Sequence, residues 1–552
     1  MRYLRKFALT LFVWSSIGGI VTAQAYEPPA GIPEPTFGID ETRPAHPPQW
    51  PATERQGYYF VDNTHPNATD NNNEFGYPDK PRATLPIDIG VWPAGTYVEV
   101  HGGPYYVSRN QWRVYTNGTA ENPTWLVGDE SSKPIFRFEF IIEDTSHFIV
   151  EHLKFDTHLR WIRATGQSDH LVIRYCELTG DTNAVARASM IGVSGDPGKR
   201  SSDVLVYRNN IHDSGDTSGV NEVDINGITN PAYIDRLWIL ENEIYRVGGD
   251  SVRVGQNQGR MPEPSALPHF TYLGRNHFYG NGENAIDVKH ATDVIISENQ
   301  LHGISNVVSS SGEAVVIHEN AERVWVIGNT VYDAEIGLIN TSGTDVWFIA
   351  NEIYDIHAQG GFDPESNYGR GVAIHFRGIS SGGVVNNTIH DYDKGVQISS
   401  GSSFQVVNNI FSSRSEQSSY DIMFSNSSLV GATTLQNNNL FTDFRSKVGS
   451  TSYWSLAQFR GATGYETDGI IGSPKFINAA QNNFSILDDS DAIDSGMDSD
   501  IYDVFQSLYG LSIRKDFSGN NRPLFQGWDM GSREFVGGLV PKSPENLQAF
   551  GD

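Results

Sequence analysis

Ionisable side chains of complementary kinds recur at two positions in a set of short alternating segments. The segments are EVDIN (222–226), SVRVG (251–255), AIDVK (285–289), AVVIH (314–318), GLINT (337–341), AIHFR (373–377) and GVQIS (395–399). Their second and fourth residues are almost all aliphatic or Phe, so the third and fifth residues should point outward. When the segments are aligned, the polar outward residues are Asp224, Asn226, Arg253, Asp287, Lys289, His318, His375 and Arg377. The alignment therefore predicts one polar surface patch.

A lysine beside carboxylates, a histidine and arginines is suited to removing a weakly acidic C–H proton next to a carboxylate. In a uronic acid this proton lies at carbon 5, and the carboxylate must first be neutralised. We expect Lys289, with a lowered pKa, to take the proton. His318 would protonate the leaving oxygen or share charge stabilisation with Arg377 and Arg253, and Asp287 completes the predicted catalytic set. The residues predicted to bind substrate are Arg253, His375, Asp224 and Asn226.

Two other kinds of protein fit the same patch. Asp224 and Asp287 are aligned two coils apart, hence about 9–10 Å between backbones. This spacing is compatible with the carboxyl pair of an inverting glycoside hydrolase, about 6.5–9.5 Å apart. The third possibility is a non-catalytic polysaccharide-binding protein. Trp325 and Trp347 share an outward position on adjacent coils, where they could stack on sugars, although packing under a loop is the more ordinary use.

The strands that must position the patch are marked by a repeated four-residue motif. It consists of Asn, any residue, an aliphatic or aromatic residue, and usually a second aromatic residue or His. Its copies begin at Asn209, Asn242, Asn276, Asn299, Asn329, Asn351, Asn387 and Asn408. Each copy follows a short alternating strand such as LWILE or VWVIG. A shortest spacing near 22 residues with longer excursions is typical of a solenoid whose coils carry loops. We therefore predict an all-β, right-handed parallel β-helix with these Asn side chains stacked at one edge.

Three stretches of the sequence resemble polysaccharide lyase family 6, the alginate lyase and chondroitinase B group. They are GGDSVRVG (248–255), NHFYGNGENAIDVKHATDVIISEN (276–299) and SSGEAVVIHENAERVWVIGN (310–329). Lys289 falls on the base lysine of the family, whereas His318 stands where the strand pattern places its catalytic arginine. The resemblance implies a parallel β-helix that cleaves an acidic polysaccharide such as alginate by β-elimination.

The same resemblance bears on a metal. Glu283 and Asn284 fall near the two calcium-binding glutamates of the family, one residue closer to the lysine, and only one of them is an acid. With Asp250 they offer the oxygen atoms that a hard cation prefers. Calcium at Asp250, Glu283 and Asn284 is therefore an expectation that rests on the resemblance.

The composition and the N-terminal segment indicate where the protein is located and which partners it can bind. Residues 1–25 have the basic start, apolar run and Ala23-Gln24-Ala25 site of a secretory signal, so the mature chain is expected to begin at Tyr26, secreted or periplasmic. No later stretch has the length of a membrane span. The single Cys176 allows no internal disulfide, and a net charge of −27 argues against a nucleic-acid partner. We expect a monomer that binds an acidic polysaccharide.

The rest of the chain reads as one domain. Residues 26–56 form a Pro-rich lead-in, and 57–540 form the β-helix, with an N-terminal cap and coils from about 90 to 490. Segments at 492–496, 516–523 and 528–531 resemble the closing segment of such proteins, and 541–552 reads as a linker-like tail.

Overall fold

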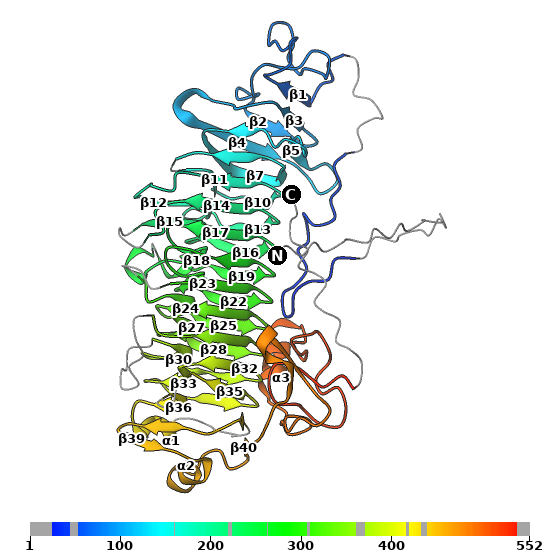
Figure 1. Ribbon diagram of the computed structural model, residues 1–552. Coiled ribbons are helices and arrows are strands. Elements are labelled where there is room, and N and C mark those ends of the chain that lie inside the picture. Colours follow the sequence, from blue (N-terminus) through cyan, green and yellow to red (C-terminus); the bar gives the residue numbers. More distant parts are fainter. Residues whose placement is uncertain are drawn as a thin grey trace, which may run out of the picture.

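The chain winds as a right-handed parallel β-helix, whose coils stack along one long axis (Figure 1). The computed structural model describes residues 25–44, 53–158, 160–218, 223–261, 263–305, 310–359, 370–415, 419–431 and 439–537. The predicted fold class is confirmed. The predicted tail, and the predicted signal apart from Ala25, lie outside these residues.

Successive strands of a coil enter three parallel ladders, here called A, B and C, and the long β7 serves both A and B. Ladder A comprises β2 (Val91–Pro93), β4 (Gln111–Asn117), β7 (Glu139–Glu151), β9 (Ile162–Thr165), β12 (Arg187–Val193), β15 (Asp224–Asn230), β18 (Val252–Gly255), β21 (Ile286–Lys289), β24 (Glu313–His318), β27 (Ile336–Asn340), β30 (Val372–Phe376), β33 (Lys394–Ile398), β36 (Tyr420–Phe424), β38 (Ser446–Val448) and the antiparallel β39 (Thr451–Tyr453).

The other two ladders complete each coil. Besides β7, ladder B comprises β1 (Tyr58–Asp62), β3 (Tyr97–His101), β5 (Thr124–Gly128), β10 (Asp169–Arg174), β13 (Ser201–Tyr207), β16 (Ile234–Leu240), β19 (His269–Gly274), β22 (Thr292–Ser297), β25 (Glu322–Ile327), β28 (Thr344–Ile349), β31 (Gly382–Val385) and β34 (Phe404–Val407). Ladder C comprises β6 (Ile135–Phe136), β8 (Lys154–Asp156), β11 (Glu177–Thr179), β14 (Asn210–Ser214), β17 (Glu243–Val247), β20 (His277–Tyr279), β23 (Gln300–Ile304), β26 (Thr330–Ala334), β29 (Glu352–Ile356), β32 (Thr388–Tyr392), β35 (Ile410–Arg414), β37 (Leu440–Phe441) and β40 (Ile470–Ile471).

Few elements lie outside the ladders. They are the short helices η1 (Ser108–Asn110), η2 (Gln258–Arg260), η3 (Pro264–Ala266) and η4 (Ala479–Gln481), the helices α1 (Ser427–Gly431), α2 (Leu456–Thr463) and α3 (Ile501–Tyr509), and the antiparallel pair β41 (Phe476–Asn478) and β42 (Asn483–Ile486). No helix in the described parts of the chain is both long and apolar enough to cross a membrane.

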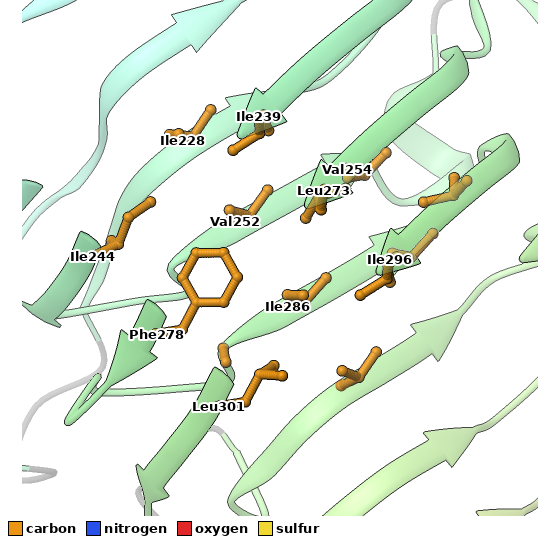
Figure 2. Packing of buried hydrophobic residues seen from close by; sticks show 14 of the residues in the cluster. Ile228, Ile239, Ile244, Val252, Val254, Leu273, Phe278, Ile286, Ile296 and Leu301 are labelled. Carbon is orange, nitrogen blue, oxygen red and sulfur yellow. The ribbon is translucent and has the colours of Figure 1, made fainter. Parts of the chain in front are cut away.

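The interior is built from inward side chains that stack in register from coil to coil (Figure 2). Ile228, Val252 and Ile286 form one such row in ladder A, and all three are fully buried. Ladders B and C contribute the parallel rows Ile239–Leu273–Ile296 and Ile244–Phe278–Leu301. Burying each of these side chains stabilises the fold by about 1.5–3 kcal/mol, and every coil adds one such side chain to each of the three rows.

The asparagine of the repeated motif forms a hydrogen-bonded ladder between B and C. The Asn351 carboxamide accepts from the backbone N–H and the Nδ2 of Asn329, at 2.9 and 3.0 Å, and donates to Asn387 and to the Val326 carbonyl. The same pattern repeats in Asn209, Asn242, Asn276, Asn299, Asn329, Asn387, Asn409 and Asn439. Buried backbone groups at this corner thus find partners without water.

One predicted member of this ladder is wrong. Asn409, not Asn408, accepts from the Asn387 backbone. Asn408 has a φ of 58° and occupies the left-handed turn position that precedes the ladder asparagines from Asn209 to Asn409, as Glu241 and Glu298 do. Cys176 stands at the first end of the ladder, and its N–H donates to Asn209. Glu466 accepts from Asn439 at the other end, and its burial raises its pKa to about 8.

The outer face of ladder B is covered by segments from both ends of the chain. Residues 26–44 of the lead-in run along it: the Gly38 carbonyl accepts from Arg174, and the Ala30 N–H donates to Glu298. Beyond that point α3 takes over, with the Phe505 ring 4.9 Å from the Trp325 ring (Figure 1). The two segments meet where Gly31 touches Phe505. We call this pair of covering segments the clasp.

The clasp decides between the alternative uses of Trp325. Trp325 is buried, and its indole Nε1 donates to the Tyr509 hydroxyl at 3.1 Å. Trp347 stacks on it, with ring centroids 6.2 Å apart. The shared outward position is confirmed, and Trp325 packs under α3, which leaves it no face for a sugar ring.

Candidate functional site

The predicted outward columns are formed by ladder A over most of their length. Arg253 lies beside Asp287, and the same row continues through Val316, Ile339, His375 and Gln397. In the neighbouring row Gly255 lies beside Lys289, and Lys289 beside His318. The alignment is therefore correct from β18 onward.

The placement of Asp224 is wrong. Thr229, not Asp224, lies beside Arg253, because β15 buries both Ile225 and Ile228 and so breaks strict alternation. Asp224 lies beside Arg187 instead and forms an ion pair with it at 3.0 Å. The aligned carboxyl pair on which the hydrolase interpretation depended is absent from this column.

Asp287, Lys289 and His318 form a hydrogen-bonded cluster on the outer face of β21 and β24. Both residues of β21 point outward because the residues before each of them, Ile286 and Val288, are fully buried. The Lys289 Nζ lies 2.6 Å from Asp287 Oδ2, and the His318 Nδ1 lies 3.0 Å from Asp287 Oδ1. The Asp287 side chain is only 3% exposed, whereas Lys289 and His318 are 20% and 33% exposed. One buried carboxylate thus orients two groups that solvent can reach.

Electrostatics in this cluster favour an ionised aspartate and a protonated lysine. Burial alone would raise the pKa of Asp287, but the hydrogen bond from His318 and the charge of Lys289 hold it below its usual value. Burial likewise would lower the pKa of Lys289, yet the neighbouring Asp287 carboxylate raises it. The lowered lysine pKa that the sequence suggested is not found, because the carboxylate outweighs burial.

The two arginines and His375 lie in different surroundings. Arg253 is half-buried one rung from Asp287, and its buried Nε has no hydrogen-bond partner among the described residues. Arg377 is exposed, and it directly follows β30, two coils beyond the strand that carries His318. His375 is fully buried, its Nε2 lies 2.9 Å from the Ser399 hydroxyl, and its burial lowers its pKa to about 3. Arg253 therefore belongs to the cluster, and His375 is placed to support the fold beneath the surface.

A second polar group lies beside the cluster, at the corner that leads from ladder C into ladder A. Asp250 is 2% exposed, and its backbone N–H donates to the Asn226 carboxamide at 2.9 Å. Its Oδ1 accepts from Asn284 Nδ2 at 2.9 Å. Burial, with the charges of Asp287 and Glu283, raises the pKa of Asp250 well above its usual value. Asn226, also buried, thus holds Asp250 and does not face the solvent.

These contacts bear on the expected calcium site. Asn284 turns its amide nitrogen toward Asp250, and its carboxamide oxygen accepts from the Ser310 hydroxyl at 3.0 Å. A calcium ion requires oxygen atoms directed at one point. Because Asn284 directs nitrogen and not oxygen at Asp250, the set of Asp250, Glu283 and Asn284 does not fit such a site in this arrangement. Calcium binding stays a prediction, which the following experiment tests.

Substituting Asp250→Asn is expected to raise the melting temperature, and the gain should grow between about pH 4 and neutrality. An aspartate with a raised pKa costs the folded state more as pH rises past its unfolded value, about 3.9, and a neutral amide removes that cost. Circular dichroism melts at pH 5 and pH 8 measure this, with the exposed Asp488→Asn as the control. Calcium would reverse the outcome: the substitution and a chelator would then both lower the melting temperature.

Three long segments between the strands, 255–269, 301–312 and 357–371, are described in part. The segment 255–269 carries η2 and η3 and is described except for residue 262, whereas 306–309 and 360–369 lie outside the described residues. The sequence patterns did not identify the roles of Asn226 and Ser310. Aligning the turns before the strands, as well as the strands, would have brought Asp250 next to Asn284.

Comparison with known proteins gives structural similarity alone. No protein-family model matches the chain, and a search of curated proteins gives no match. A rhamnogalacturonan lyase is 14% identical, covers 69% of this chain and 87% of its own, and has a TM-score of 0.38. PfbA, a surface adhesin of Streptococcus pneumoniae, is 12% identical over 65% of this chain and 86% of its own, with a TM-score of 0.41. The periplasmic alginate epimerase AlgG is 8% identical over 59% and 78%, with a TM-score of 0.34. At these values similarity transfers no activity, and function is argued from the side chains.

Proposed function

We propose that the protein is an exported polysaccharide lyase that cleaves an acidic, uronic-acid-containing polysaccharide such as alginate by β-elimination. The observation that carries the proposal is the cluster in which buried Asp287 holds Lys289 and His318 side by side on the outer face of ladder A. Arg253, one rung away, adds a second cation. Two cations beside a histidine suit a reaction that removes a proton next to a carboxylate and builds negative charge on it.

The raised pKa of Lys289 suggests how the roles divide. A lysine that stays protonated is suited to binding the sugar carboxylate and to giving a proton to the leaving oxygen. The base is then His318, since Asp287 accepts from its Nδ1 and leaves Nε2 to take the carbon 5 proton. Arg253 and, further along the solenoid, Arg377 would bind neighbouring carboxylates. The lysine and the histidine thereby exchange the roles expected from the sequence.

A glycoside hydrolase stays the second candidate because of one observation. The pKa of Asp250 is raised and that of Asp287 is lowered, which is the division between acid and base that paired carboxylates use in glycoside hydrolysis. Against it, both residues are about 2% exposed, so neither carboxylate is accessible to a sugar in this conformation. The partly exposed Lys289 and His318 favour elimination.

The product distinguishes the two reactions. Elimination leaves a carbon 4–5 double bond that absorbs in the ultraviolet, whereas hydrolysis leaves a new reducing end without that absorbance. Screening alginate, pectate, ulvan and glycosaminoglycans for both signals tests the proposal. Reducing ends without absorbance, lost in Asp250→Asn or Asp287→Asn and kept in Lys289→Ala, would assign the protein to the hydrolases.

A further inference from the structure

A cleft of about 590 Å³ opens on the first coils of the solenoid, well away from Lys289. Its walls are the turns that precede β4, β7 and β9, where the chain passes from ladder C into ladder A. In later coils the same corner carries Asn284 and leads into the strand of Asp287. The cleft and the proposed catalytic cluster therefore lie along one edge of the molecule.

The cleft is cationic, although the chain as a whole carries a net charge of −27. Arg109, Arg137 and Arg160 line it, against two carboxylates. Both carboxylates are already paired: Asp156 with Arg137 at 2.9 Å, and Glu139 with Arg163 at 3.1 Å, a residue just beyond the lining. Arg109 makes no ion pair with any residue that the structure describes, and Arg160 is 68% exposed, 3.6 Å from Glu139. Arg109 is therefore available to an anionic ligand, and the exposed Arg160, which shares Glu139 with Arg163, can reach the same ligand.

The rim of the cleft adds an aromatic ring and a strained turn. Tyr106 is 64% exposed, and its hydroxyl accepts from Arg137 at 3.2 Å, which holds the ring at the cleft wall. An exposed aromatic ring offers an apolar face for a sugar. Arg109 and Asn110 have φ values of 61° and 53°, a conformation uncommon for such residues and enriched where a ligand is clamped.

A continuous outward row of ladder A joins the cleft to the catalytic cluster. Arg163 lies beside Gly192, Gly192 beside Thr229, Thr229 beside Arg253, and Arg253 beside Asp287. Four steps of about 4.8 Å place Arg163 about 19 Å from Asp287 along the axis. A sugar chain that follows this row is long enough to occupy both places when it contains several units.

We propose that the cleft is a distal binding site for carboxylate-bearing sugars, which holds a remote part of the same polymer whose cleavage is proposed at Lys289. Arg109 and Arg160 bind the carboxylates, and the Tyr106 ring packs on a sugar face. The link to Lys289 rests on the proposed function, whereas the affinity of the cleft for acidic sugars does not. Long polymers should therefore bind more tightly than oligosaccharides too short to span the row.

The test measures binding of alginate and polygalacturonate to the Lys289→Ala protein, so that cleavage does not interfere. Adding Arg109→Ala and Arg160→Ala together is expected to weaken polymer binding about 10-fold or more, as the loss of charge-assisted hydrogen bonds predicts. Binding of trisaccharides at the catalytic cluster should not change. Arg246→Ala, an arginine on ladder C that is 52% exposed, is the matched control and should leave polymer binding unchanged.

Each outcome decides the proposal. Polymer affinity that is unchanged in the double variant, an equal loss in Arg246→Ala, or no binding of either polymer would overturn it. If affinity falls as expected while no polymer yields an unsaturated product, the cleft is supported and the lyase proposal fails. If the unsubstituted protein yields an unsaturated product while the double variant keeps its polymer affinity, the lyase proposal is supported and the cleft proposal fails. Melting temperatures of all variants show whether the substituted proteins stay folded.

Discussion

Replacing Lys289 by alanine is expected to lower the rate of unsaturated product formation by about 10³-fold or more. The substitution removes the cation that Asp287 holds at 2.6 Å in the partly exposed part of the cluster. Without it the sugar carboxylate is less well neutralised, and the leaving oxygen loses its nearest proton donor. The measurement is the initial rate of ultraviolet absorbance on the best substrate of the screen.

Two further variants give this experiment its controls. Lys154→Ala removes another half-buried, ion-paired lysine, bound to Glu177 on ladder C, and should leave the rate unchanged. Lys289→Arg keeps the positive charge and should retain a measurable part of the activity if the residue acts as a cation. An inactive arginine variant with a normal melting temperature would return the role of base to Lys289.

Replacing Asn351 by alanine is expected to lower the free energy of unfolding by about 3 kcal/mol or more, one of the largest effects of a single polar substitution in this protein. The change leaves the backbone N–H of Asn329 without a partner, and Asn329 Nδ2 and Asn387 Oδ1 each lose one of their hydrogen bonds. All three residues are fully buried, so water does not replace the lost bonds at once.

Denaturant unfolding followed by circular dichroism measures this loss. Asn71→Ala is the matched control, because Asn71 is exposed and its side chain makes no hydrogen bond in the described structure, so it should change stability little. A midpoint for Asn351→Ala equal to that of the control would show that the ladder is not a major source of stability.

The fold was predictable because polar residues as well as apolar ones repeat once in every coil. Each buried Asn marks one coil, and neighbouring strands alternate strictly enough to place Lys289 beside His318. Ladder C was not recognised as a separate sheet, since strands such as β20 have three residues and lie within the motif itself. The predicted coils begin near residue 90, whereas ladder B already begins at β1, because β1 pairs with β3 across a long intervening loop.

The errors in the site have local physical causes. Pattern alone does not separate Asn408 from Asn409, since two asparagines in a row differ only in which one takes the left-handed turn. The shift at Asp224 arises inside β15, where two core isoleucines stand three residues apart. The raised pKa of Lys289 follows from Asp287, two residues earlier and on the same face, whose charge matters more than the burial on which the prediction relied.

The clasp has a consequence for the order in which the chain can assemble. The lead-in is synthesised first, yet it docks on coils that contain Arg174 and Glu298, and it meets Phe505, which is synthesised near the end. Its contact with Phe505 therefore forms only after the intervening coils have been synthesised. Solenoid coils otherwise depend on their immediate neighbours alone. By closing a loop of most of the chain, whose entropic cost grows only slowly with length, the clasp makes the first and last segments of the protein depend on each other.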